Sequence, residues 1–180
     1  MVNNKTYNNV VNTLLKMGEN HEQIYTTSVG DIWSINLEKM QKFALLHINP
    51  ISVQTSDATL TYNFQIFIMD MADEKANWTM NNANANFSKL YKTLGNEQDV
   101  FNETLQICTD FIGMLRHSTQ QSTNGDINNA VYFTDDHFSI EPFQERFDNL
   151  CCGWVFNLGV LVQNDFQTCE IPVTTAGAGY

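Results

Sequence analysis

The sequence predicts an α+β fold in which helices pack on one face of a mainly antiparallel β-sheet. Three observations support this class: an amphipathic segment near the N-terminus, several segments in which apolar and polar residues alternate, and one long helical segment in the middle of the chain. Helix, strands, long helix and strands follow one another in an order typical of α+β domains. Hydrophobic residues make up 43% of the 180 residues, which is enough for a core. We expect one domain over residues 1–172 and a flexible tail over residues 173–180.

The first predicted element is a helix of about a dozen residues near the N-terminus, because its apolar residues recur at the spacing of one helical face. These residues are Tyr7, Val10, Val11, Leu14 and Leu15. Gly18 offers a C-terminal stop for this helix. A mixed connection follows, and residues 43–48 then read as a strand that ends before Pro50.

Residues 59–69 form the strongest predicted strand, because apolar and polar side chains alternate with a period of two. Near the end of this segment Phe67 and Met69 make both faces apolar. We therefore expect the strand to be central and to be covered on both sides there.

Residues 97–116 form the second predicted helix, with Asn96 as its N-cap and Glu97 and Asp99 in the first turn, where the helix dipole favours anions. The apolar residues cover about half of the helical circle, which indicates a helix lying across a sheet. A polar stretch from Ser118 leads to three further predicted strands, which cover residues 131–133, 138–143 with an interruption at Pro142, and 152–162.

Residues 71–96 differ in composition from the rest of the chain, since many asparagines alternate with isolated aromatics. Such a segment has little to bury by itself, and we expect an arm or lateral loop that orders against a neighbouring copy. An ordinary surface loop is the alternative. The candidate subunit-interface residues in this arm and elsewhere are Trp78, Phe87, Leu90, Tyr91, Tyr132, Phe133 and Tyr180.

The charge of the chain argues against several partners. The net charge is −11, with 20 acidic and 9 basic residues, whereas affinity for nucleic acid or an anionic membrane comes from Lys and Arg. The negative charge is compatible with a surface along which DNA passes without adhering. The simpler interpretation is that the charge maintains solubility. Only 16% of residues are charged, and neutral amides and hydroxyls cost less to desolvate, which favours subunit contacts. The polar start and the absence of a long apolar run predict synthesis in a cytoplasm.

The sequence contains no motif of a known catalytic or phosphate-binding site. Asp135, Asp136 and His137, with Glu141 and Glu145, are the residues best suited to a divalent ion, but their spacing does not match a metal motif and a solvated acidic loop is the default. We therefore expect no catalytic residue, no metal and no cofactor.

The four cysteines show no paired spacing of the kind that binds metal or carries redox chemistry. We expect Cys108, Cys151, Cys152 and Cys169 to be reduced thiols, most of them buried.

Three segments in order, residues 61–70, 103–110 and 140–149 leading into Gly153 and Trp154, resemble virion proteins of large tailed phages, including crAss-like phages. Those proteins build rings below the portal, and the architecture is similar to the tail-completion or tail-terminator fold. The resemblance covers about residues 5–172 and lies in structural motifs.

This resemblance implies a structural virion protein that forms a homo-oligomeric ring of six or twelve copies at the phage neck, the head-to-tail junction. Such a protein is made in the host bacterial cytoplasm, acts as a head-tail connector, contacts other neck and tail proteins, and lets DNA pass without binding it specifically. The alternatives are a tail hub or baseplate adaptor, and a small enzyme or ligand-binding domain around the acidic loop at 135–145.

Overall fold

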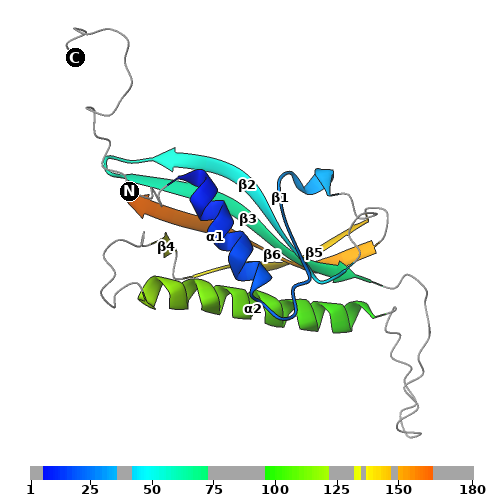
Figure 1. The fold of residues 1–180 in the computed structure, drawn as a ribbon. Helices are drawn as coiled ribbons and strands as arrows, with labels where there is room; N and C mark the ends of the chain where they lie inside the picture. The colour runs from blue at the N-terminus through cyan, green and yellow to red at the C-terminus, as the bar shows by residue number, and fades with distance from the viewer. Residues whose placement is uncertain are drawn as a thin grey trace, which may run out of the picture.

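The computed structural model describes residues 6–35, 42–72, 96–121, 132–134, 137–146 and 150–163, and these carry all structural statements below. The chain folds as α+β, with a mixed, mostly antiparallel sheet and two helices packed against it (Figure 1). The elements in order are α1 (Tyr7–Glu19), β1 (Thr26–Val29), the short 3₁₀ helix η1 (Ile32–Ser34), β2 (Leu45–Thr55), β3 (Thr59–Met71), α2 (Glu97–Gln121), β4 (Phe133–Thr134), β5 (Ile140–Arg146) and β6 (Leu150–Gln163). The predicted fold class is confirmed.

The strand order in the sheet is β1-β2-β3-β6-β4, and β5 also pairs with β6. β1 runs parallel to β2, and every other pair is antiparallel. β5 lies along the first half of β6, and β4 lies beside its second half, where Phe133 pairs with Leu161. The two short strands therefore share one edge of the sheet.

The main core lies between the sheet and the two helices, which cover the same face (Figure 1). Because strand side chains alternate between faces, the even-numbered residues of β3 from Tyr62 to Ile68 point toward the helices. Val10 and Leu14 of α1 and Phe111 of α2 pack on them and are fully buried.

The long helix α2 is held across the sheet near its N-terminus by a side chain of β6. Trp154 Nε1 donates a hydrogen bond of 2.7 Å to the Phe101 carbonyl, and the two rings meet edge to face at 5.6 Å between centroids. The predicted N-cap position agrees, since the Asn96 carbonyl accepts the first helical hydrogen bond, from Val100 N–H at 3.0 Å.

A second, smaller core lies on the opposite face at one end of the sheet. Leu45, Phe67, Met69 and Cys151 form it, and residues around η1 together with Phe143 pack against it. The prediction that the end of β3 is covered on both sides is therefore confirmed.

Pro50, which was expected to end a strand, and Pro142, which was expected to interrupt one, both lie inside continuous strands. β2 continues through Pro50 to Thr55, and β5 continues through Pro142 to Arg146, so these two predictions were wrong. Pro50 lies just beyond the part of β2 that pairs with β1, next to a register shift between Pro50 and Ser52, and Pro142 lies on a strand at the sheet edge. Edge strands and bulges tolerate proline because no neighbouring strand needs its missing N–H.

Other boundaries also moved. Gly18 does not stop α1, which ends at Glu19; it lies inside the helix, where a Cβ would be 2.8 Å from Thr27 Cγ2 and would collide with Leu46. α2 extends to Gln121, so the polar residues from Ser118 begin as helix. The strand β1 was not predicted, because its four residues show no clear alternation.

Candidate assembly surface

At one end of the sheet the strands carry no charged residue, and the exposed Asp57 lies in the hairpin turn that joins two of them. We call residues 49–55 of β2, 59–65 of β3 and 157–163 of β6 the neutral end; none of them is Asp, Glu, Lys, Arg or His. These three segments are neighbours in the sheet, since residue 63 pairs with residue 52 on one side and 159 on the other. In a chain with a net charge of −11, this is a distinct surface.

The face of the neutral end that points away from the helices consists mainly of amides and hydroxyls. Its side chains are at least partly exposed, and Asn63 Nδ2 donates to Ser52 Oγ at 3.1 Å. They include Ser52, Gln54, Thr59, Thr61, Asn63, Gln65, Asn157, Leu161 and Gln163. Uncharged polar groups can be buried against a partner at lower cost than charged groups, provided that they find hydrogen bonds.

The outer edge of β2 is also exposed at this end. β1 pairs with β2 only from Leu45 to Ile48, and in the described part of the chain no strand lies on the outer side of residues 49–55. Ile51 and Val53 have 55% and 52% of their surface exposed. Reasoning from the sequence missed these two residues, because the segment was expected to follow the end of a strand. The sequence did contain an indication of a strand here, because the segment is uncharged and Ile51 and Val53 alternate with polar residues.

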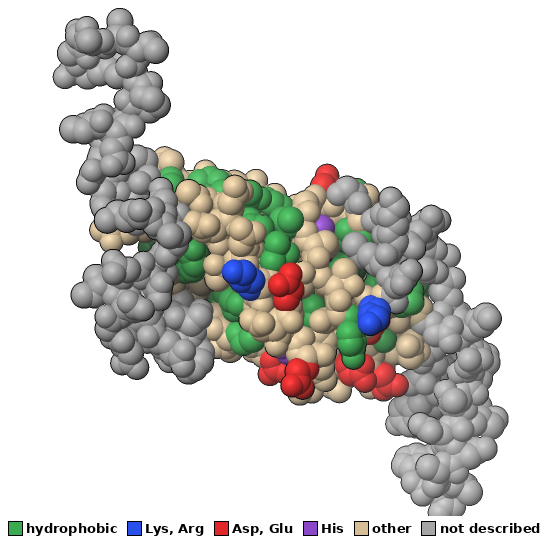
Figure 2. All heavy atoms as spheres, viewed as in Figure 1, with side chains coloured by type: hydrophobic (Ala, Val, Ile, Leu, Met, Phe, Trp, Pro, Cys, Tyr) green, Lys and Arg blue, Asp and Glu red, His purple; other side chains and the backbone are tan. Residues whose placement is uncertain are grey.

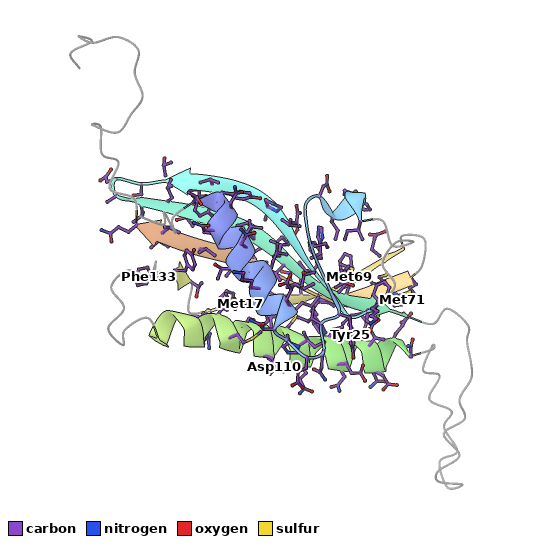
Figure 3. All side chains as sticks on the ribbon, viewed as in Figure 1. Met17, Tyr25, Met69, Met71, Asp110 and Phe133 are labelled. Atoms are coloured by element: carbon purple, nitrogen blue, oxygen red, sulfur yellow. The ribbon has the colours of Figure 1, made fainter. Side chains whose placement is uncertain are left out.

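Of the seven candidate interface residues, the structure describes Tyr132 and Phe133. Phe133 on β4 has 54% of its surface exposed and borders the neutral end through its pairing with Leu161 (Figure 3). Tyr132 is partly buried and lines a crevice of about 20 Å³ between the helices and β6, which is room for about one water molecule. The other candidates lie outside the described residues: Trp78, Phe87, Leu90, Tyr91 and Tyr180.

The acidic loop considered for metal binding is described only in part. Asp135 and Asp136 lie outside the described residues, and His137 and Glu141 are exposed. Glu141 and Glu145 pair in register with residues 155 and 151 of β6, so both belong to a regular strand. Over the described residues, no three His, Cys, Asp or Glu side chains come close enough together to hold a metal ion.

Among the described residues, a serine–histidine pair is the arrangement closest to a catalytic dyad. Ser28 Oγ lies 2.8 Å from His47 Nδ1, and His47 Nε2 lies 2.9 Å from the Gly30 carbonyl oxygen. Since a carbonyl only accepts, Nε2 carries the proton and Nδ1 accepts from the serine hydroxyl. His47 as a whole is only 2% exposed, and burial lowers its pKa, although the Gly30 hydrogen bond and Asp31 partly oppose this. A buried pair of this kind fastens β1 and the turn after it to β2.

The described cysteines are poor nucleophiles. Cys108, Cys151 and Cys152 are buried free thiols, and burial is the largest cause of pKa values raised to about 12, 11 and 11. The thiolate is the reactive form, so these groups are almost entirely protonated at neutral pH and react slowly. Cys151 belongs to the second core, whereas Cys152 packs with Ala72 and Val100, because neighbouring strand residues point to opposite faces. Cys169 lies outside the described residues.

No protein-family model matches this chain, and no curated protein matches it. Among the helices of the described segments, none is long and apolar enough to span a membrane.

Proposed function

We propose that this chain is a structural subunit of a homo-oligomeric ring at the head-to-tail junction of a tailed phage. In this role it joins portal-side components to the tail and lines the passage through which DNA leaves. The observation that carries the assembly role is the neutral end of the sheet, an uncharged surface on a strongly acidic protein. The resemblance of three segments to phage ring proteins supports the location.

The neutral end supports assembly because copies of this chain repel one another elsewhere. Two molecules that each carry −11 charges approach most readily where charge is absent. Contacts through amides, hydroxyls and exposed apolar side chains also bury no unpaired ion. A head-to-tail interface repeated by rotation closes such contacts into a ring.

The acidic surface supports the DNA passage. Acidic side chains gather along the exposed side of α2 (Figure 2), where Asp99, Glu103 and Asp110 are exposed (Asp110 is labelled in Figure 3). Facing the lumen, these carboxylates would repeat in every copy and repel the phosphates of passing DNA.

Light scattering during size-exclusion chromatography, with negative-stain microscopy, tests the assembly. We expect a ring of six or twelve copies from the purified full chain at micromolar concentration. The triple variant Asp99→Asn, Glu103→Gln, Asp110→Asn is the control and should form the same ring, because these residues lie away from the neutral end. A chain that stays monomeric across this range and up to a hundredfold higher concentration contradicts the proposal.

Gold-labelled antibodies against this chain, bound to intact virions, test the location. Labels at the neck support a head-to-tail ring. Labels confined to the tail tip instead identify a hub or baseplate adaptor, and virions without label remove the chain from the particle.

A further inference from the structure

The outer edge of β2 changes character after Ile48. Up to that residue β1 covers it, and Gly30 N–H donates to the Ile48 carbonyl at 3.0 Å. Residues 49–55 continue as a strand with β3 on one side and, within the described residues, no strand on the other. Along an edge strand every second residue directs its N–H and C=O outward, so this segment offers a template for one more strand.

The other edge strands, β1, β4 and β5, are short or carry proline and charge, whereas residues 52–55 of β2, which follow Pro50 and its register shift, carry neither. β5 carries Pro142 together with Glu141, Glu145 and Arg146, and β4 has only two residues. Proline, charge and shortness are devices by which proteins prevent sheets from joining edge to edge. β1 is four residues long and is followed by Gly30 and Asp31. Residues 49–55 carry no charge, and their one proline lies at the start of the segment.

The surface beside this edge contains exposed apolar side chains. The exposed Val53 of β2 pairs with the buried Tyr62 of β3. The centroid of the Tyr62 ring lies 6.1 Å from that of Tyr7, and Tyr7 is exposed like Val53. Figure 2 shows a strip of hydrophobic side chains along β2 beside α1. The directly opposite residue of an added strand would lie about 5 Å from Val53, within contact distance.

We infer that a second copy of this chain adds an extended segment to residues 49–55 of β2, continuing the sheet from one subunit into the next. The occupant is a copy of the same chain because two such acidic proteins meet most readily where neither carries charge. The inference rests on the proposed ring, which requires a head-to-tail contact. The added segment is therefore a part of the neighbour other than its own β2, since two identical edges would close a dimer.

Two matched valine substitutions test this inference in the full-length chain. Val53→Lys places a charge on the exposed edge, whereas Val29→Lys makes the same change on the neighbouring strand β1, where Val29 is 44% exposed. A lysine buried at a subunit contact costs enough to raise the concentration needed for assembly at least about tenfold. We expect Val53→Lys to lose assembly to this extent and Val29→Lys to assemble like the wild type. Circular dichroism of both variants checks that the fold is retained.

Amide hydrogen exchange on the same samples tests the strand addition itself. Outward-facing amides in residues 49–55 should exchange at least about tenfold more slowly in the assembled wild type than in the folded Val53→Lys monomer. Unprotected amides in an intact assembly overturn the inference.

If Val53→Lys unfolds, its loss of assembly says nothing about the edge contact. Amide exchange is then compared between the assembled wild type and the wild type diluted to monomers. Slower exchange of residues 49–55 in the assembly supports the inference, and unprotected amides overturn it.

The two proposals fail separately in this design. A ring that Val53→Lys leaves intact overturns the edge contact but not the ring. A dimer that Val53→Lys dissociates, with protected amides in 49–55, supports edge pairing by a second copy but overturns the ring and the head-to-tail geometry. A wild type that is monomeric at all concentrations overturns both proposals.

Discussion

Substitution of Gly153 by alanine should destabilise the fold through one steric contact. Gly153 lies in the middle of three paired strands, opposite Met69 of β3 and Phe143 of β5. A Cβ at this position would be 2.7 Å from Met69 Cα and 2.9 Å from Ile68 C, and would collide with the Ile68 carbonyl oxygen. All three atoms belong to the backbone, so no side chain can rotate away. The Gly153 backbone is not left-handed, so the effect is that of the added methyl group.

The size of the effect follows from the movement required. The distance from the added Cβ to Met69 Cα must increase from 2.7 Å to at least about 3.4 Å, where ordinary van der Waals contact begins. This movement separates β3 from β6. Overpacking of this kind costs about 1–3 kcal/mol, and each weakened ladder hydrogen bond adds about 1 kcal/mol. A total of about 3 kcal/mol lowers Tm by about 6–12 °C in a protein of this size.

Gly113→Ala is the matched control, since it adds the same methyl group at an exposed position of α2 where nothing lies within 4 Å. Alanine favours a helix over glycine by about 1 kcal/mol, so this variant should melt about 2–4 °C above the wild type. Thermal unfolding followed by circular dichroism at low protein concentration measures both. A Gly153→Ala protein with the same Tm as the wild type would refute the close approach of β3 and β6.

Three further outcomes follow from the buried titratable groups. Burial, with a smaller effect of Glu103, raises the pKa of Asp70 in the folded protein above its ordinary value of 3.8. The stabilising contribution of this group is therefore complete below pH 3.8 and is lost as the pH rises through the pKa of the folded state. Asp70→Asn should raise Tm at pH 7 and leave it unchanged near pH 3. Burial lowers the pKa of His47 in the folded protein from 6.5. The contribution of neutral His47 to stability is therefore complete above pH 6.5 and is lost as the pH falls through the pKa of the folded state. His47→Gln should make the decline of Tm between pH 7 and 5 less steep. Alkylation at pH 8 with peptide mapping should modify Cys151 and Cys152 about a hundredfold more slowly in native than in unfolded protein, because their pKa values move from 9.0 to about 11 and the thiolate is the reactive form; equal rates would contradict the burial of these thiols.

Local patterns were sufficient for the elements that bury one face. The helical spacing from Tyr7 to Leu15 and the alternation from Leu60 to Ile68 are direct consequences of packing against a core, and both elements were predicted. The wide apolar arc of α2 likewise predicted a helix lying on the sheet. The candidate surface was predicted only in part: Phe133 borders the neutral end, whereas Ile51 and Val53 were overlooked because Pro50 seemed to end their strand.

The sequence by itself determined the class of the fold, the faces of its main helices and strands, and the strongly acidic charge. Only the tertiary structure decided that β2 continues past Pro50, that the parallel strand β1 covers just four of its residues, and that three uncharged segments meet at one end of the sheet. The physical reason is that periodicity reports which side of an element is buried, whereas the position of a strand at an edge depends on pairing between distant segments. Whether proline and the absence of charge weaken a strand or leave an edge open for a partner is settled by that pairing.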